Sequence, residues 1–544
     1  MKRRPLTVWT PFNVVDSVLF ALLTVLINPT ATNAKDGSVR RFSLAEVVSF
    51  LLGQVRRALY AEVHEVVSTL DPGSTDEFGE RKARMILLTD LANEPDDQET
   101  LTRLVLYSNE IDVEAIVATT SYLKRFLDRK SIAAGQAVLT AYAEVYPRLR
   151  VHDQDYPDPA VLQSRFVLGQ NAVGMAGVGP TAALSAGAQA ILAALAADDP
   201  RPVWICIGGG PNTLAAALYH ARENLGAAEL DRYVGKLRVY AISDQDNSAQ
   251  WIRENFPNVH WVGEPSPPNA MGAVFSFVRS QWTGISGEPI YRPWTSNRGP
   301  NSTLISRKWL AENIQAKGAL GAAYPRPLAA MEGDTPDWFS LAKNGLAADR
   351  NPSWGGWGGR YVFATPRGER RPMWTRGSGS SDTVVGFDGA THTDHYASIY
   401  RWRDAFQYDF ANRMDWTMKE FGDTNHAPQI TVNGIAGTAP VYVQCRTGET
   451  VSFTTEGTFD PDPEDTLEYH WFHYPEAGTS ATTPATIAIT TAEVDGAVTV
   501  SATSPGTAHL ILQVRDGGNG GRGYPMTSYR RVVLSVVDSG RCGG

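Results

Sequence analysis

Cysteine is scarce in this 544-residue sequence, which contains only three. Neither a CxxC pair nor clustered histidines accompany them, so a structural zinc site is not expected. Cys206 lies in the apolar run VWICIGG and is predicted to be a buried thiol. Cys445 and Cys542 lie at either end of the last hundred or so residues, where they could pair if the protein is exported.

Positive charge is not in excess, and long apolar runs are absent. The formal net charge is −9, whereas a surface that binds nucleic acid is normally basic. Beyond the first 30 residues no stretch is apolar enough to cross a bilayer. We therefore expect no nucleic-acid partner and no stable membrane insertion.

The N-terminal region has the features of an export signal. Residues 1–34 combine the basic start MKRR, the apolar run VLFALLTVLI and the small residues TATNA, which is typical of a signal peptide. An N-terminal anchor is the alternative, and export implies a secreted, extracellular protein. Residues 35–83 are predicted to form a helical extension, because Ser43 and Glu46 have the spacing of a capping box before a helical apolar pattern.

Alternating β-rich and helical segments begin at Arg84 and predict an α/β domain over residues 84–424. Near-continuous apolar strands favour a mostly parallel sheet flanked by helices. In such sheets, ligands bind beyond the carboxyl ends of the strands. The expected strands are 84–90, 113–120, 202–210, 237–244 and 259–265, and the expected helices are 98–107, 125–145, 182–197 and 212–224. Residues 267–425 are interpreted mainly as long loops, with a closing helix over about 395–419.

Residues 425–544 form a second domain in this interpretation. Short alternating segments, such as the one with Leu510, Leu512 and Val514 on one face, predict an all-β sandwich. The acidic residues between these segments could hold calcium, although turn formation is the simpler interpretation: Asp460, Asp462, Asp465 and Asp516.

The stretch TDLANEPDDQET places four carboxylates within eight residues, directly after a predicted strand: Asp90, Glu94, Asp96 and Asp97. Pro95 suits the first position of a helix, and Asn93 or Glu94 could cap it. A helix N-terminus tolerates one or two carboxylates, but four would repel one another without a cation. Calcium prefers carboxylate and carbonyl oxygens. This stretch alone is compatible with either a divalent-metal site or a solvated, capped helix N-terminus.

ILLTDLANEPDDQETLTRLVLY together with GGGPNTLAAAL resembles the nucleoside hydrolases. SDQDNSAQWIRENFP, EGDTP, WGGRY, HYPEAGT and HLILQVRDGG are similar to a secreted nucleoside-hydrolase-like subgroup with a C-terminal immunoglobulin-like domain. Some members of that subgroup are labelled cellulose-binding proteins. The resemblance covers about residues 84–537.

The resemblance implies a Ca²⁺ ion at the carboxyl edge of the sheet. Its ligands would be Asp90, Asp97, the main-chain carbonyl of Asn212 and Asp334. Ala92 stands where the family has its second aspartate, the general base. The catalytic base would then be Asp90 or Glu94, with Asn93 as another replacement.

The remaining candidates are substrate-binding residues. Asp96 would bind a sugar hydroxyl, and His392 and His395 are candidates for the acid that protonates the leaving group. Each could instead be an ordinary surface or core residue. The full set is Asn93, Asp96, Asp244, Gln245, Asp246, Glu332, His392 and His395.

Two functions are compatible with this sequence. The first is hydrolysis of an N-glycosyl or related glycosyl bond by a calcium-activated water. The second is non-catalytic binding of a carbohydrate, such as cellulose or another plant polysaccharide, on a nucleoside-hydrolase scaffold. The expected partner is a small sugar or a polysaccharide, and a purely structural surface protein is a weaker third possibility.

Overall fold

The structure, a computed structural model, describes residues 81–538 apart from 266–283, 286–299, 329–330, 378, 387–388, 479–483 and 492–495. All described residues belong to one compact unit of the chain. The predicted signal peptide, nearly all of the N-terminal extension and Cys542 lie outside the described residues. Cys445 is buried, and its pairing with Cys542 stays a prediction.

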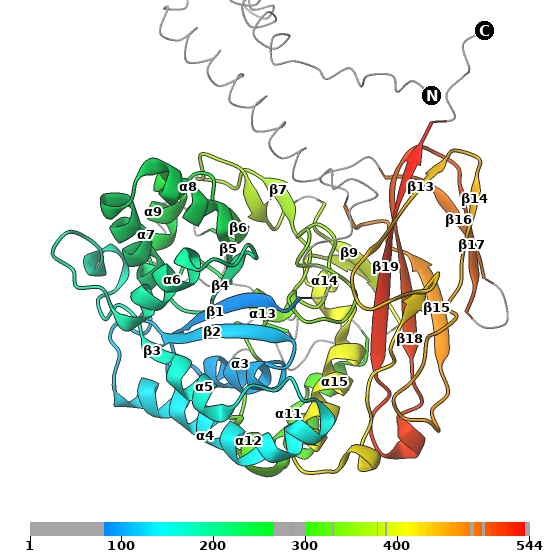
Figure 1. Cartoon of the computed structure of the whole chain (residues 1–544), viewed down its shortest axis with the longest axis horizontal. Helices are drawn as coiled ribbons and strands as arrows, with labels where there is room; N and C mark the ends of the chain where they lie inside the picture. Colours follow the sequence, from blue (N-terminus) through cyan, green and yellow to red (C-terminus); the bar gives the residue numbers. More distant parts are fainter. Residues whose placement is uncertain are drawn as a thin grey trace, which may run out of the picture. The chain divides into compact units, whose positions relative to one another are not determined.

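An eight-stranded sheet forms the centre of the α/β part (Figure 1). Its order is β3-β2-β1-β4-β5-β6-β8-β7, and every neighbouring pair is parallel except β7 with β8. This confirms the predicted mostly parallel α/β fold. The strands are β1 (Ala83–Thr89), β2 (Ile111–Ala118), β3 (Phe166–Leu168), β4 (Val203–Ile207), β5 (Leu237–Ala241), β6 (His260–Gly263), β7 (Val362–Ala364) and β8 (Met373–Thr375).

Helices cover both faces of this sheet (Figure 1). Alternate residues of β1 enter different cores: Met85 and Leu87 pack on one side, and Ile86 and Leu88 on the other. The α-helices are α3 (Pro95–Leu106), α4 (Arg129–His152), α5 (Pro159–Arg165), α6 (Ala186–Ala196), α7 (Asn212–Asn224), α8 (Ala227–Lys236), α9 (Ser248–Asn255), α11 (Arg307–Leu310), α12 (Gly318–Ala323), α13 (Pro336–Phe339), α14 (Ala397–Tyr400) and α15 (Arg403–Trp416). Short 3₁₀ or π segments are η1 (Gly174–Gly177), η2 (Ser302–Ile305), η3 (Ala311–Gln315), η4 (Phe421–Asp423) and η5 (Asn519–Gly521).

The interpretation of 267–425 as mainly loops is wrong in part. The sheet gains β7 and β8 from this region, and a separate hairpin of β9 (Asp382–Val385) and β10 (Thr391–Asp394) follows. These strands are only three or four residues long, so their alternation is too brief to stand out from the surrounding Gly- and Arg-rich sequence.

The C-terminal part is a two-sheet β-sandwich, as predicted (Figure 1). Leu510, Leu512 and Val514 lie in the core between the sheets, whereas Ile511 points the other way and joins a core of the α/β part. One sheet is β13-β19-β18-β15 and the other is β14-β17-β16, beside a small β11-β12 pair. Their bounds are β11 (Thr431–Val432), β12 (Ile435–Ala436), β13 (Val441–Arg446), β14 (Thr450–Phe453), β15 (Glu468–His473), β16 (Ile487–Thr491), β17 (Val498–Ala502), β18 (Gly506–Arg515) and β19 (Thr527–Val537).

The two central strands of the four-stranded sheet, β18 and β19, are therefore largely buried on both faces. Polar contacts add to the shared core: the Tyr529 amide donates to the Asn344 carbonyl at 2.8 Å, and Arg531 Nε donates to the Leu346 carbonyl at 2.6 Å. The sandwich thus packs directly against the α/β part.

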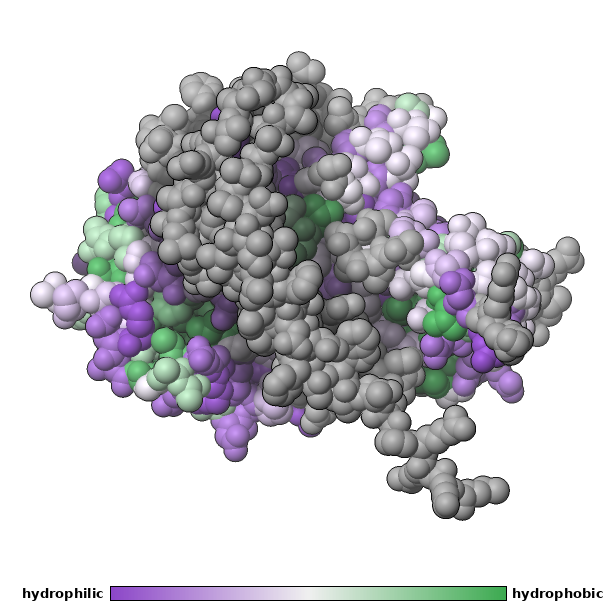
Figure 2. Space-filling view, turned by 90° about the horizontal axis from the view of Figure 1, so that it is seen from above, coloured by the Kyte–Doolittle hydropathy of each residue, from purple (hydrophilic) through white to green (hydrophobic). Residues whose placement is uncertain are grey.

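In the space-filling view, the described surface shows small hydrophobic patches scattered among hydrophilic residues (Figure 2). Within the described ranges, no helix combines the length and the apolar character that a bilayer crossing requires.

Candidate functional site

The acidic stretch lies where the sequence predicts it, between β1 and the N-terminus of α3. The Asn93 amide donates to the Asp90 carbonyl at 3.0 Å, which closes a tight turn in which Ala92 has a left-handed φ of 65°. Pro95 begins the helix as predicted, and Glu94 occupies the N-cap position without a side-chain capping bond. The turn therefore sends the chain from the strand end into a helix whose first turn carries Asp96 and Asp97.

Three consecutive glycines after β4 form the opposite side of this site. Leu88 pairs in register with Ile207, so the end of β1 and the start of this loop lie at one edge of the sheet. An added Cβ would lie 2.3 Å from Cγ of Asp334 at Gly208, and 2.8 Å from the Asp90 amide at Gly209. Only glycine permits such close approach, and the loop brings acids from distant segments together.

Asp97 is the centre of the resulting acid cluster. Its carboxylate interacts with those of Asp90 and Asp334, and Thr89 Oγ1 donates to its Oδ1 at 2.7 Å. Burial raises the pKa of Asp97 well above its usual range, and the nearby Asp90 carboxylate raises it further. The pKa of Asp334 is raised for the same reasons, by burial first and then by Asp97 and Asp96.

Asp90 is the most strongly supported member. Ser121 Oγ, which follows the end of β2, donates to Asp90 Oδ2 at 2.5 Å. Burial raises the pKa of Asp90 to about 6, while the bond from Ser121 opposes that shift. This residue therefore combines a fixed orientation with a proton affinity close to neutral pH.

Two further buried acids, Glu99 and Asp337, lie close to this cluster. Glu99 and Asp337 are fully buried, and burial raises the pKa of both carboxyls. Glu99 Oε2 accepts from the Glu332 amide at 2.9 Å. Within the described ranges Glu99 Oε1 and both Asp337 oxygens lack a well-formed hydrogen bond, although the Trp338 amide is close enough to lower the pKa of Asp337.

This donor set fits a divalent cation. Six acids are almost entirely buried, and no described Lys or Arg pairs with any of them: Asp90, Asp96, Asp97, Glu99, Asp334 and Asp337. Buried carboxylates without positive partners must be protonated or neutralised by another cation. Hard oxygen donors of this kind suit Ca²⁺ or Mg²⁺. Asp90, Asp97 and Asp334 do not bring one oxygen each to within 4.8 Å of both others, so closing around an ion would require small side-chain shifts.

Three predicted sugar ligands are occupied by protein partners. Both Asp244 oxygens accept from Arg253, at 2.8 and 2.7 Å. Asp246 accepts from the amide and hydroxyl of Ser248 at the start of α9, and Gln245 Nε2 donates to the Gly208 carbonyl. These side chains hold the edge of the sheet together, and their placement does not support the prediction that they bind substrate.

Glu332 also differs from expectation. Glu332 is fully buried in a two-bond pair with Arg103, so its oxygens are not available to a sugar. Asn212 is the first residue of α7. The main-chain carbonyl of Asn212 stays a predicted metal ligand, and its side chain donates to Thr120 Oγ1 at 2.8 Å.

The two histidines lie on the β9–β10 hairpin rather than in the central sheet. His392 is in β10 opposite Val384, and His395 Nδ1 lies 2.8 Å from Ser380 Oγ. Burial lowers the pKa of His395. Their role as the leaving-group acid stays a prediction. Asn93 and Glu94, by contrast, are half-buried beside the cluster.

Sequence reasoning missed the supporting residues of the site. Ser121, Glu99, Asp337 and the triglycine loop all contribute to it. Glu99 follows Asp97 by two positions and Asp337 follows Asp334 by three, but single acids at such spacings are common on surface helices. Only their burial distinguishes them.

Comparison with known proteins gives a family for this architecture. The family model described as "Cellulose-binding Sde182, nucleoside hydrolase-like domain" matches residues 84–361. The chain belongs to this family. A second model, "Cellulose-binding protein Sde0182, C-terminal domain", matches residues 450–536 of this Sde182-family chain.

A solved structure supports the assignment. A nucleoside hydrolase-related protein from Saccharophagus degradans, described as associated with carbohydrate metabolism, is 33% identical with a TM-score of 0.68. The alignment covers 84% of this chain and 100% of that protein. Two effector proteins, XOO4466 and XopQ complexed with adenosine diphosphate ribose, are each 12% identical to this chain, with TM-scores of 0.28 and 0.27. These similarities are too low to support a conclusion about this protein. XOO4466 aligns over 62% of this chain and 94% of its own, and XopQ over 62% and 95%. No curated protein matches the chain.

Proposed function

We propose that this Sde182-family protein hydrolyses glycosyl bonds of a carbohydrate, with a divalent cation held by the acid cluster. The observation that carries the proposal is the convergence of Asp90, Asp97 and Asp334 on the triglycine loop without a basic partner in the described structure. The family description as cellulose-binding and the relative's association with carbohydrate metabolism favour a sugar or polysaccharide as the ligand.

The proposal gives the residues of the site two roles, cation binding and proton transfer, and Asp90 takes part in both. Asp97, Asp334 and Asp90 would hold the cation, for which we propose Ca²⁺. When bound, such an ion polarises and orients a water molecule. Asp90 is the proposed proton acceptor, because Ser121 fixes its orientation beside the other cation ligands. Asp96 is the proposed ligand of a sugar hydroxyl, since it lies in the same first turn of α3.

Non-catalytic carbohydrate binding is the second candidate, and Ala92 favours it. The family resemblance expects a carboxylate base at this position, but the methyl group of Ala92 is solvent-exposed on a left-handed turn. Proton acceptance would then fall entirely on Asp90 or on half-buried Glu94. If neither performs it, the site retains ligands but loses turnover.

Turnover and binding must be measured separately to distinguish these functions. The purified protein is incubated with aryl glycosides, nucleosides and cello-oligosaccharides, in calcium and in EDTA. Hydrolysis is expected only in calcium and only when Asp97 is present, so Asp97→Asn should abolish it. Asp231→Asn, an exposed carboxylate in α8, is the matched charge control and should remain active.

Binding to soluble cellulose derivatives is followed by affinity electrophoresis with the same proteins. If wild type hydrolyses nothing in the panel while wild type and Asp97→Asn are retarded equally by polysaccharide, the hydrolase proposal is rejected and binding remains. We further propose that residues 1–34 direct export to the extracellular medium; a mature protein that starts near residue 35 in the culture supernatant would support this.

A further inference from the structure

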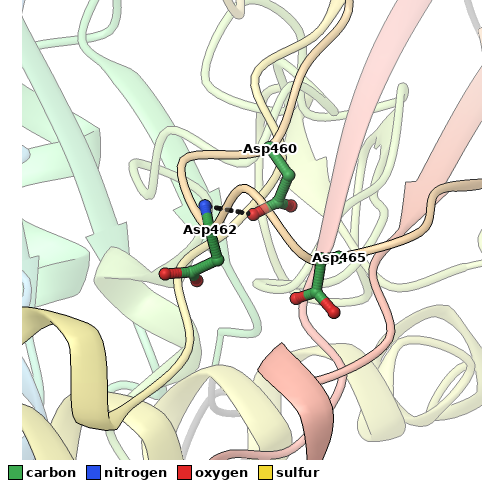
Figure 3. Close-up of side chains that lie close together, drawn as sticks. All are labelled: Asp460, Asp462 and Asp465. Atoms are coloured by element: carbon green, nitrogen blue, oxygen red, sulfur yellow. Dashed lines mark hydrogen bonds between the residues drawn. The ribbon is translucent and has the colours of Figure 1, made fainter.

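A second acidic group lies in the sandwich, in the loop between β14 and β15. Asp460, Asp462 and Asp465 come from this one loop (Figure 3), and each offers a carboxylate oxygen within 4.8 Å of the other two. Oxygens on opposite sides of a calcium ion lie up to about 5 Å apart, because Ca–O distances are about 2.3–2.6 Å. Within the described ranges, this is the acidic group with that compactness.

A buried carboxylate from another loop points to a ligand at this place. Asp516 follows β18 and is only 3% exposed. Its Oδ1 accepts from the amides of Gly518 and Met526 and from Asn425 Nδ2, at 2.8–2.9 Å. Its Oδ2 has no hydrogen-bond partner within the described ranges. Asp516 lies beside the acidic loop, because a Cβ added at the next residue, Gly517, would lie 3.0 Å from Asp465 Oδ1. The Asp516 charge also acts on Asp460, and the Asp465 charge acts on Asp516.

Two more oxygens are left free beside it. Asp460 Oδ1 accepts from the Asp462 amide at 2.8 Å, but its buried Oδ2 has no partner in the described parts of the chain. The same holds for Oδ1 of Asn425, a residue with 0% exposure. Leaving several buried oxygens unpaired is unfavourable, and an oxygen-seeking cation would satisfy them together.

Most of these carboxylates are not neutralised by a basic side chain within the described ranges. Asp462 is the exception: burial raises its pKa, but the His426 amide, which donates to it at 2.8 Å, and the positive charge of Arg522 oppose that rise. No described Lys or Arg forms an ion pair with the other three: Asp460, Asp465 and Asp516.

We propose that Asp460, Asp462 and Asp465, with Asp516 and Asn425 beside them, bind a calcium ion at this end of the sandwich. Asp516 is not within 4.8 Å of all three, so a small side-chain shift would bring its free oxygen to the ion. The site is separate from the acid cluster at β1 and α3, and it does not depend on the proposed hydrolase function.

Its position suggests what the ion does. Asn425 links the site to the α/β part, because its carbonyl accepts from Trp416 Nε1 of α15 at 2.9 Å and its Nδ2 donates to the Tyr524 carbonyl at 2.9 Å. Asn519 Nδ2 donates to the Thr424 carbonyl at 2.6 Å across the same junction. Calcium would therefore fasten two sandwich loops to the segment that leaves α15.

The test uses Asp460→Asn and Asp516→Asn in the full chain, singly and together. In each residue Oδ1 already accepts backbone or side-chain donors, so asparagine can keep those bonds and replace only the free oxygen with an amide nitrogen. The fold is thus preserved, while a cation loses two oxygen ligands. Asp97→Asn and Asp231→Asn serve as the comparison variants.

Calcium binding is measured by isothermal titration calorimetry after EDTA treatment. The double variant is expected to bind one fewer calcium ion than wild type, and Asp97→Asn is expected to retain the ion at this site. Calcium should also slow proteolysis of residues 417–427 in wild type and in Asp97→Asn, but not in the double variant. The proposal is overturned if the double variant binds as many ions as wild type, or if calcium protects that segment equally in both.

Discussion

Replacing Arg103 with methionine should strongly destabilise the protein. Arg103 and Glu332 are both 0% exposed. The guanidinium makes two bonds to Glu332, at 2.5 and 2.8 Å, and one to Gln407 Oε1 at 2.7 Å, and it lies 3.8 Å from the centroid of the Phe410 ring. Methionine would preserve much of the apolar packing but leave the Glu332 carboxylate unpaired, close to Glu99.

The expected loss in the free energy of unfolding is about 3–5 kcal/mol, which is typical of removing one partner of a buried ion pair. Adding Glu332→Gln should recover about 2 kcal/mol, because the double variant no longer buries a bare charge. Urea unfolding followed by circular dichroism measures both values. The reasoning would be refuted if Arg103→Met stayed within about 1 kcal/mol of wild type, or if the double variant were no more stable than the single one.

Three further predictions concern other features. Ala92→Gly should raise the free energy of unfolding by about 1 kcal/mol, because glycine adopts the left-handed φ of 65° without strain; an unchanged urea midpoint would contradict this. Burial and the adjacent Arg531 hold the pKa of His509 well below 6.5, so only the unfolded chain takes up this proton as the pH falls. The free energy of unfolding should therefore decrease from about pH 7 to pH 5, by at most roughly 1.4 kcal/mol per pH unit. His509→Gln should remove this contribution; if the free energies of the two proteins change with pH by the same amount, the prediction is wrong. Phe126 is 62% exposed in the loop after β2, and its loss should weaken binding of a cello-oligosaccharide roughly two- to tenfold with no change in melting temperature; equal affinity of Phe126→Ala and wild type would exclude a stacking role.

Much of the fold and the centre of the site could be predicted from the sequence. The strand MILLT and the helix opened by Pro95 are local signals, so they place Asp90, Asp96 and Asp97 at one edge of the sheet. Asp334 joins them as the family resemblance implies. The alternation of Leu510, Leu512 and Val514 likewise predicts the face of β18 that enters the sandwich core.

The partners of the other candidates could not be predicted. Arg103 pairs with Glu332 across 229 positions, and no local pattern indicates which of many arginines will reach a given acid. The same applies to Asp244. It follows a strand, where a substrate-binding residue is expected, but Arg253 from the next helix donates to both of its oxygens. Position at a strand end therefore identifies where a side chain lies, whereas its availability depends on packing.

The loop acids of the sandwich show the same limit. Turn formation and calcium binding both explain Asp460, Asp462 and Asp465 in the sequence. The observation that favours calcium comes from Asp516, about fifty residues further along, whose buried Oδ2 has no hydrogen-bond partner within the described ranges. Such convergence is a property of the folded sandwich.

Calcium titration of the Asp460→Asn/Asp516→Asn double variant tests the central claim most directly, because it leaves the acid cluster as the remaining proposed site. We predict that this variant binds one calcium ion and that adding Asp97→Asn eliminates the binding. A double variant that binds no calcium, or binding that survives Asp97→Asn unchanged, would contradict a cation held between Asp90, Asp97 and Asp334.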